Sequence, residues 1–287
     1  MQSNISSPLV LMSDFGLRER FVASMKGVAH SIAPALSIFD LTHKIAPFNI
    51  WEASRTLAHT ITSWNPGTVF VSVVDPGLGT AQASVVALTE TGHFIVTPEN
   101  GTLSLVEKKL GIQAIYEINR AKYLRPGTEK SHTFHGRDLY VYVGALLASK
   151  QVDLEQVGKM YKKPIIRLQI PEAEILPDVG LQGAITGIEH PYGNIVSNIP
   201  ADWLDALELS PETHSLVQIK VLHQEATIFN QAIPLAQSFG FVQFRHPLIY
   251  GDSEGYLGLA LNQGNFSKVY QVDFGEKWIL QVHKVLS

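Results

Sequence analysis

TVFVSVV at residues 68–74, followed directly by DPGLGT at residues 75–80, is the stretch of this chain that decides the fold. Thr68 to Val74 is β-branched and apolar, which is typical of a strand buried on both faces of a parallel sheet. Asp75 ends the apolar run abruptly, and a Pro-Gly-x-Gly turn follows. Because ligands bind at the carboxyl ends of strands in open α/β sheets, the Asp75 carboxylate is placed at a candidate site.

Two other apolar runs end in polar residues in the same way. Leu9 to Met12 leads into Ser13-Asp14-Phe15-Gly16, and Phe94 to Val96 leads into Pro98-Glu99-Asn100-Gly101. Since the carboxyl ends of neighbouring parallel strands meet at one edge of a sheet, the three polar segments predict a single site.

Strand-like and helix-like segments alternate through the first half of the chain. The predicted strands cover residues 8–12, 36–41, 68–74, 84–88, 93–97 and 114–118, and the predicted helices cover residues 18–32, 50–64, 103–110 and 139–149. This alternation predicts an α/β domain over residues 1–168, with a mostly parallel sheet flanked by helices.

The pattern changes beyond Lys162. Pro164, Pro171 and Pro177 mark a connector, and short β-like runs follow it, with one helix near residues 201–207. These runs predict a second domain over residues 178–287, an all-β fold in the form of a small barrel.

Composition excludes several classes of function. A net charge of −4 and a pI near 6.3 leave no electrostatic footprint for nucleic acid or an anionic membrane. The chain has no cysteine, which excludes disulfides, thiolate metal sites and cysteine nucleophiles. No apolar run approaches the roughly 18 residues that span a bilayer, and the N-terminus has no signal-peptide pattern, so we expect a cytoplasmic protein.

No cofactor site is predicted. The His, Asp and Glu residues show no metal-ligand spacing such as His-x-x-x-His, and no phosphate-binding glycine loop follows the first predicted strand. We therefore expect neither a bound metal nor nucleoside triphosphate chemistry.

Two interpretations are open for each carboxylate at the predicted edge. Asp75 is either a turn residue whose side chain caps its own loop or a functional group that faces a ligand. Asp14 is either a helix or turn cap or a carboxylate that accepts two hydroxyls, such as those of a ribose diol.

TFHGRD at residues 133–138 is the second dense polar cluster. His135 is a candidate general base, proton shuttle or helix start, and Gly136 beside it permits close approach of a ligand to the backbone. We interpret Arg137 and Asp138 as an ion pair that holds the loop. The polar turns at residues 189–194 and 252–255 are explained by hairpin chemistry alone.

Eight motifs occur along nearly the whole chain. They are SDFG at 13–16, MKGV at 25–28, DLTHKIAPFNI at 40–50, VVDPGLGT at 73–80, PENG at 98–101, TFHGRD at 133–138, HPYGNIVSNI at 190–199 and SEGYLGLALNQG at 253–264. In this order they resemble the S-adenosyl-L-methionine (SAM) hydroxide adenosyltransferases, also called SAM hydrolases, and their fluorinase and chlorinase relatives. That family has an α/β domain followed by a small β-barrel domain, in agreement with the two domains predicted above.

The resemblance implies a homotrimer with each active site at a subunit interface. Asp14 would bind the ribose, Phe48 would pack beside the nucleoside, and Asn194 would contact adenine. The implied contacts further include Asn262 and Gln263 at adenine, Glu189 and Ser253 at the amino-acid end of the substrate, and Phe15, Asn100, Phe134, Tyr192 and Glu254 elsewhere around it. The resemblance implies no cofactor, since SAM itself is the substrate.

Asp75 and His135 decide the nucleophile within the resemblance. In the resemblance, the halogenase pattern has Tyr at the position of Asp75 and no His at position 135. A carboxylate repels a halide, whereas a water nucleophile gains an acceptor that orients or deprotonates it. The resemblance therefore implies hydrolysis of SAM to adenosine and L-methionine by attack of water on ribose C5′.

Gln82 departs from the family pattern. Hydrolases of the family resemble an Asp-Arg-His triad with the Arg seven residues beyond the Asp, and this chain has Gln82 there. Gln donates a hydrogen bond but brings no positive charge, so the enzyme is slow unless another basic residue reaches the site. Two alternatives stay open: a SAM or adenosine binding protein with weak or no catalysis, and a SAM-dependent halogenase, which Asp75 disfavours.

Overall fold

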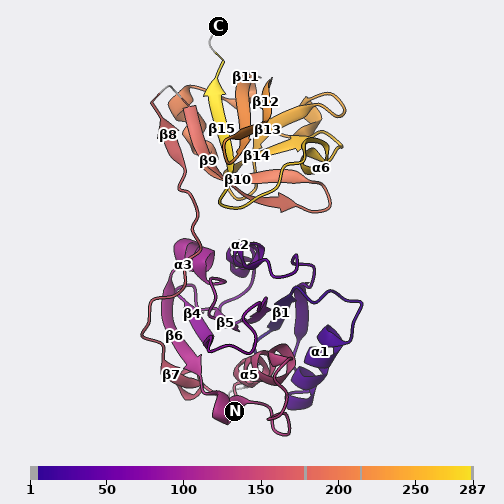
Figure 1. The fold of residues 1–287 in the computed structure, drawn as a ribbon, viewed down its shortest axis with the longest axis vertical. Helices are drawn as coiled ribbons and strands as arrows, with labels where there is room; N and C mark the ends of the chain where they lie inside the picture. Colours follow the sequence, from indigo (N-terminus) through magenta and orange to yellow (C-terminus); the bar gives the residue numbers. More distant parts are fainter. Residues whose placement is uncertain (1–5, 178–179, 214, 286–287) are drawn as a thin grey trace. The chain divides into compact units, whose positions relative to one another are not determined.

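The computed structural model describes residues 6–177, 180–213 and 215–285, and the chain divides into two compact units (Figure 1). The first unit contains the residues up to Leu168, and the second begins at Gln169.

The first unit is built on a seven-stranded sheet with the order β2-β1-β3-β5-β4-β6-β7. The strands are β1 (Leu9–Ser13), β2 (Ile38–Thr42), β3 (Val69–Val73), β4 (Ser84–Thr89), β5 (Phe94–Pro98), β6 (Ile112–Ile118) and β7 (Gly158–Met160). Neighbours among β2, β1, β3 and β5 pair in parallel, which confirms the mostly parallel sheet. The sequence pattern does not predict that β4, β6 and β7 pair antiparallel with their neighbours, because periodicity carries no information on strand direction.

Helices cover both faces of this sheet (Figure 1). Alternate residues of β1 point to opposite faces, so that Leu9 and Leu11 enter one core and Val10 and Met12 enter the other. The first core is closed by α1 (Phe21–Ile32) and α5 (Val141–Ala148), and the second by α2 (Ile50–Thr60) and α3 (Ser104–Leu110).

Helix α5 confirms the prediction of a buried helix at its position, although it starts later than the sequence indicates. A single π-helical turn, Gly136–Tyr140, precedes it and makes the transition from the TFHGRD segment. Gly144 brings α5 close to the sheet, because a Cβ at this position would lie 2.5 Å from Cγ2 of Val71 and 3.2 Å from Cδ1 of Leu9.

We expect Gly144→Ala to lower the free energy of unfolding by about 1–2 kcal/mol, because overpacking against β1 and β3 outweighs the better helix propensity of alanine. Gly27→Ala in α1 is the matched control. Gly27 is also helical, but nothing lies within 4 Å of its ideal Cβ, so we expect that variant to be about 0.5–1 kcal/mol more stable. Urea unfolding of both variants measures the two signs, and stabilisation by both substitutions would contradict the close packing of α5.

The second unit is an eight-stranded antiparallel sheet with the order β12-β11-β15-β9-β10-β14-β13, and β8 pairs with β9. The strands are β8 (Glu174–Leu176), β9 (Gly180–Glu189), β10 (Asn194–Pro200), β11 (Leu216–His223), β12 (Ala226–Pro234), β13 (Pro247–Gly251), β14 (Tyr256–Leu261) and β15 (Trp278–Lys284). A bridge between Leu235 and Ile249 joins the two ends of the sheet and nearly closes it. The predicted barrel-like all-β domain is confirmed.

Two helical details of the second unit differ from the sequence prediction. The predicted helix near residues 201–207 is a 3₁₀-helix, Ala201–Leu207, and a short helix that the pattern does not predict, α6 (Phe266–Tyr270), follows β14. Helix α6 has only five residues, too few to show a helical period, and begins where Asn265 Oδ1 accepts a hydrogen bond from the backbone N–H of Lys268 (2.7 Å).

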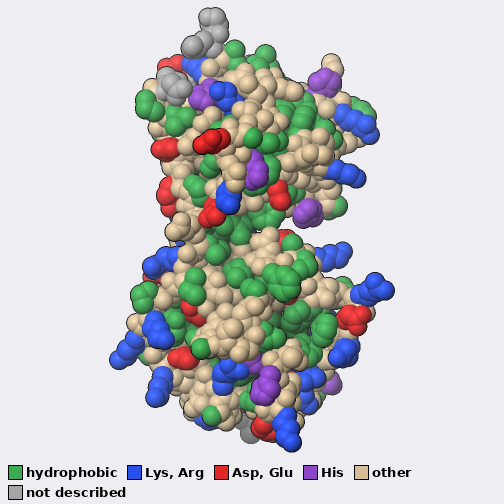
Figure 2. All heavy atoms as spheres, in the orientation of Figure 1, with side chains coloured by type: hydrophobic (Ala, Val, Ile, Leu, Met, Phe, Trp, Pro, Cys, Tyr) green, Lys and Arg blue, Asp and Glu red, His purple; other side chains and the backbone are tan. Residues whose placement is uncertain are grey.

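Within the described ranges, none of the helices combines the length and the apolar character needed to cross a bilayer. Figure 2 shows acidic, basic and hydrophobic side chains interspersed over one face of both units.

Candidate functional site

A cavity of about 460 Å³ lies at the carboxyl ends of β1 and β3, where the sequence predicts a site. It brings together six of the predicted site residues: Asp14, Phe15, Phe48, Asp75, Phe134 and His135. Phe21, Pro47, Val73, Leu78 and Gly136 complete its lining.

The Asp75 carboxylate is held by one side chain from its own loop and one from the helical segment that begins at Gly136. Its Oδ1 accepts a hydrogen bond from Gln82 Nε2 (3.0 Å), and its Oδ2 accepts one from the Tyr140 hydroxyl (3.3 Å). The Tyr140 hydroxyl in turn accepts a hydrogen bond from Ser84 Oγ (3.1 Å). Asp75 is therefore oriented by one hydrogen bond from its own loop, that of Gln82, and by one tertiary hydrogen bond, that of Tyr140.

Burial determines the ionisation of Asp75 and Tyr140. It raises the pKa of Asp75 above 3.8, although hydrogen bonds from Gln82 and Tyr140 and the charge of Arg120 act in the opposite direction. Burial, followed by the charge of Asp75, also raises the pKa of the Tyr140 hydroxyl far above its ordinary range. Tyr140 is therefore a permanent hydrogen-bond donor, and Asp75 is a carboxylate with increased basicity.

Gln82 contacts Asp75 because the intervening turn leaves room for its side chain. An ideal Cβ on Gly77 would collide with Gln82 Oε1, so only glycine at position 77 leaves the Gln82 amide in its place. The turn between β3 and β4 thereby brings the Gln82 amide, an uncharged donor, to the carboxylate of Asp75, seven residues earlier.

His135 is buried, and its Nε2 lies 2.8 Å from Nη2 of Arg120. Arg120 begins a short helix, α4 (Arg120–Tyr123), which Asn119 caps by accepting a hydrogen bond from the backbone N–H of Lys122 (3.3 Å). Burial lowers the pKa of His135 below 6.5, and the charge of Arg120 lowers it further, so the imidazole is neutral at neutral pH.

Asp14 is tied to Phe48 at the cavity rim. Its Oδ2 accepts a hydrogen bond from the backbone N–H of Phe48 (2.9 Å), and Phe48 has a φ of 65° with 69% of its surface exposed. A positive φ in a bulky residue is strained, and such strain clusters at ligand sites. The contact joins residues 34 positions apart, so Asp14 is not a local cap here.

A chain of polar contacts starts at the buried Ser13, next to Asp14, and ends at the surface. Ser13 Oγ lies 2.7 Å from Nδ1 of His43, His43 Nε2 lies 3.1 Å from Asp40, and Asp40 pairs with Lys26 at 2.7 Å. The chain links the SDFG, DLTHK and MKGV motifs, which lie far apart in the sequence.

Three aromatic rings form one wall of the cavity. The rings of Phe15, Phe21 and Phe134 have centroids 5.2–5.9 Å apart in tilted and edge-on arrangements. A Cβ on Gly136 would lie 3.1 Å from the ring of Phe15, so the glycine of TFHGRD lets this wall approach the helix start.

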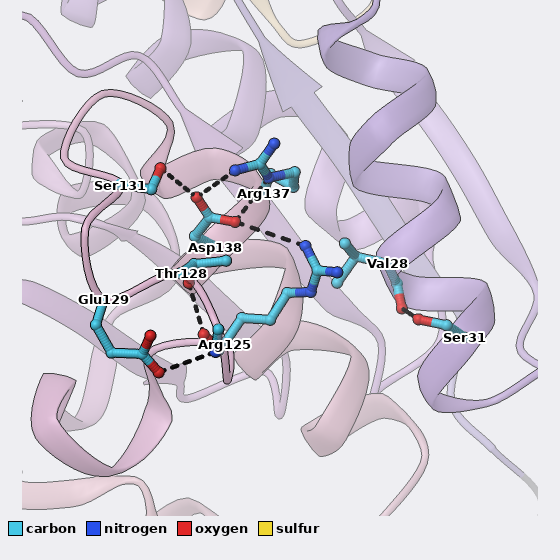
Figure 3. Close-up of polar contacts among 9 residues, drawn as sticks. Val28, Ser31, Arg125, Thr128, Glu129, Ser131, Arg137 and Asp138 are labelled. Carbon is cyan, nitrogen blue, oxygen red and sulfur yellow. Dashed lines mark hydrogen bonds and ion pairs between the residues drawn. The ribbon is translucent and has the colours of Figure 1, made fainter.

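Asp138 fills the structural role predicted for it (Figure 3). It is fully buried and accepts hydrogen bonds from Arg137 (2.6 and 2.7 Å) and from Ser131 Oγ (2.8 Å), while Arg125 lies 3.8 Å away. This cluster fixes the loop that leads into His135.

Asn100 does not line the cavity. It is buried, its Nδ2 donates to the Val74 carbonyl (2.8 Å), and its Oδ1 accepts from Thr102 Oγ1 (2.8 Å) and the Thr102 N–H (3.2 Å). Its amide therefore anchors the end of β3 directly before Asp75.

A second cavity, of about 490 Å³, lies in the second unit and gathers all three predicted adenine contacts, together with Tyr192. Tyr192, Asn194, Asn262 and Gln263 all line it. Glu189 stands behind Asn194, because its Oε2 accepts a hydrogen bond from Asn194 Nδ2 (3.1 Å). Glu189 thus fixes the orientation of the Asn194 amide.

Ser253 and Glu254 lie outside this second cavity. They occupy the exposed turn between β13 and β14, where the Glu254 and Tyr256 N–H groups donate to Oδ1 of Asp252 (2.9 Å each). In the described part of the second unit, neither Ser253 nor Glu254 lines the cavity.

Sequence analysis missed Tyr140 and Arg120. Tyr140 belongs to an apolar segment whose pattern indicates core, and Arg120 belongs to none of the eight motifs. Over the described ranges, no three His, Asp or Glu side chains come together in a cluster able to hold a metal ion.

Comparison with known proteins assigns the chain to a family. Residues 9–158 match the SAM hydroxide adenosyltransferase N-terminal domain, and residues 183–279 match the C-terminal domain of the same family. The chain belongs to the SAM hydroxide adenosyltransferase family.

Individual relatives match over nearly the whole chain. An (R)-S-adenosyl-L-methionine hydrolase of Methanocaldococcus jannaschii is 29% identical, with 96% of this chain and 95% of the relative covered. A fluorinase of Actinopolyspora mzabensis is 28% identical, with 96% and 97% covered. The solved structure of an uncharacterized conserved protein from Thermotoga maritima is 30% identical and has a TM-score of 0.86, with 96% of this chain and all of that chain covered (100%).

Proposed function

We propose that this protein hydrolyses SAM to adenosine and L-methionine. The observation that carries the proposal is the Asp75 carboxylate in the first cavity, held by Gln82 and Tyr140 with a raised pKa. Relatives named (R)-S-adenosyl-L-methionine hydrolase support the same reaction.

In the proposed reaction the oxygen of water forms a bond to ribose C5′ while the C5′–sulfur bond breaks. The bonding electron pair goes to the sulfonium sulfur, which leaves as the neutral thioether of L-methionine, and the water proton passes to Asp75. A sulfonium is a good leaving group, so the protein supplies mainly orientation and desolvation of the water. Asp14 is proposed to accept the ribose hydroxyls, with Phe48 beside the nucleoside.

Asp75 also argues against a halide as the nucleophile. A halide beside a half-buried carboxylate meets charge repulsion, which is stronger in a medium of low dielectric constant than in water. Fluorinase relatives show that the fold is compatible with halide transfer, so halides belong in the test.

We propose that the adenine contacts come from the second cavity of a neighbouring copy, in a homotrimer. The support is the separation of ribose-type and adenine-type residues into two cavities in different units. Cytoplasmic location and the lack of a cofactor stay predictions from the sequence.

The deciding experiment incubates the purified protein with SAM, with and without chloride, bromide or fluoride, and separates the nucleosides by chromatography. We expect adenosine and L-methionine at a rate proportional to protein and independent of halide. A halogenated nucleoside would instead establish halide transfer. Tight binding of SAM without product would establish a binding protein, the alternative that Gln82 motivates.

The pH dependence of this activity follows from the two shifted groups. We expect kcat/KM to be level across neutral pH and to fall on the acid side as Asp75 becomes protonated, at a pH above the 3.8 of an ordinary aspartate. Because burial lowers the pKa of His135 below 6.5, we expect its titration to add no step to the profile above pH 6.5. A second step in kcat/KM, separate from that of Asp75 and centred above pH 6.5, would contradict the lowered pKa of His135.

A further inference from the structure

We propose that Arg120 is the positioning residue that compensates for Gln82: its guanidinium holds His135 neutral with the ring proton on Nδ1 and places a positive charge near Asp75. The inference deepens the proposed function and rests on it for the catalytic consequence. The state of His135, however, can be measured without turnover.

The hydrogen bond between Arg120 and His135 has only one possible direction. A guanidinium has donors and no acceptor, so Nη2 of Arg120 donates and Nε2 of His135 accepts at 2.8 Å. An accepting Nε2 is unprotonated, and the neutral ring therefore carries its proton on Nδ1. Nε2 is then not available to take a proton from water.

Helix α4 holds Arg120 in a fixed place. Asn119 caps its start, and the buried Tyr123 at its end donates its hydroxyl proton to the Gln156 carbonyl (2.9 Å). The next turn is tied to the His135 segment, because the Arg125 N–H donates to the Asp138 carbonyl (2.8 Å). The segments that contain Arg120 and His135 are thus joined by backbone hydrogen bonds.

Several charged groups act on His135, and Arg120 is the nearest cation. Burial and the charges of Arg120 and His132 disfavour protonation of the ring, and Asp138 favours it. Asp138 is already paired with Arg137 and Arg125, while Tyr140 contributes only a ring edge with its centroid 6.5 Å away. Asp75 lines the same cavity as His135.

The charge of Arg120 also acts on Asp75, where it favours the carboxylate against burial. In the family pattern the arginine follows Asp75 by seven residues. Here a neutral amide occupies that place, and the cation, Arg120, comes from another element and contacts His135. This arrangement assigns the water proton to Asp75 and leaves Nδ1–H of His135 as a donor.

The first measurement is the protonation state of His135 by ¹⁵N-edited NMR of the full-length protein. In the native protein we expect Nδ1–H and an unprotonated Nε2 at neutral pH. In Arg120→Met we expect both tautomers and a higher pKa, and in Arg120→Lys an intermediate state. Arg167→Gln is the matched control, because the exposed Arg167 pairs with Glu107 away from the cavity, and it should change nothing.

The second measurement is kinetic. We expect Arg120→Met to lower kcat by about 10²-fold, the size seen when one electrostatic donor is removed, with KM within about threefold, and Arg120→Lys to retain part of the rate. The double variant Gln82→Arg, Arg120→Met should have a kcat at least tenfold higher than that of Arg120→Met alone. A merely structural role of Arg120 does not explain such a recovery.

Each outcome bears on the inference separately from the proposed function. An unchanged His135 tautomer and pKa in a folded Arg120→Met protein overturns it, and so does a shifted His135 with an unchanged kcat. If the native protein forms no adenosine, the proposed function fails, whereas the NMR result still decides whether Arg120 controls His135.

Discussion

Asp75→Asn is expected to lower kcat for SAM hydrolysis by at least about 10²-fold, the range for loss of a general base, and to leave the affinity for SAM within about threefold. Asparagine keeps the shape of the side chain, and its Oδ1 accepts from the Tyr140 hydroxyl while its Nδ2 donates to the Gln82 amide once that amide is turned over, but it cannot accept the proton of the attacking water. The measurement is single-turnover formation of adenosine, together with calorimetric titration of SAM.

The same variant is expected to be at least as stable as the native protein. Because the pKa of Asp75 is raised in the folded state, its ionised form disfavours folding once the pH exceeds the unfolded value of 3.8. Removing the charge removes this penalty, so the melting temperature at neutral pH should stay equal or rise. A lost rate combined with an unchanged or higher melting temperature separates catalysis from folding.

Glu155→Gln is the matched control for charge removal. Glu155 is exposed in a short 3₁₀-helix, Leu154–Gln156, and lies outside both cavities, so its rate should stay within about twofold of native, as expected for a surface substitution. Adenosine formation by Asp75→Asn at more than a tenth of the native rate would show that Asp75 does not take the proton.

Asp138→Asn is expected to lower the free energy of unfolding by about 2–3 kcal/mol, because it removes the carboxylate from a buried ion pair. Asp138 is fully buried, whereas the side chain of Arg137 is 29% exposed, so water screens part of the loss. The loop containing Ser131 loses the same anchor (Figure 3). Urea unfolding at pH 7 measures the change.

The pH dependence of this stability has a defined sign. Burial alone would raise the pKa of Asp138, but hydrogen bonds from Arg137 and Ser131 and the charges of Arg137 and Arg125 outweigh it and lower the pKa below 3.8. The stabilisation is therefore fully present above pH 3.8 and is lost as the pH falls through the lower folded-state value. Native and Asp138→Asn stabilities should converge in acid.

Glu107→Gln offers the contrast. Glu107 also makes a two-bonded pair with an arginine, Arg167 (2.7 Å each), but that pair is exposed to solvent. We expect a much smaller loss of stability there than at Asp138. Equal losses in the two variants would show that burial is not what makes Asp138 important.

The sequence by itself determined the fold class of both units. It also determined which edge of the first unit's sheet carries the polar residues of the candidate site. Strand β3 is apolar except for the buried Ser72, because helices cover both of its faces, and Asp75 follows it where the sheet edge is polar. This information is local, since burial on two faces dictates residue type position by position. Asp14, Asp75 and His135 were predicted on this basis together with the family motifs, and the structure brings them to one cavity.

Only the tertiary structure decided which partners these groups have. Tyr140 reaches Asp75 across 65 positions, Arg120 reaches His135 across 15, and Asn100 turns inward to hold Val74. Such contacts depend on strand order and on the rotation of each helix about its axis, which residue periodicity does not specify. In the sequence, Gln82 at the position of the family's arginine therefore indicates that a positive charge is missing. In the folded chain, Arg120 of helix α4 lies beside His135.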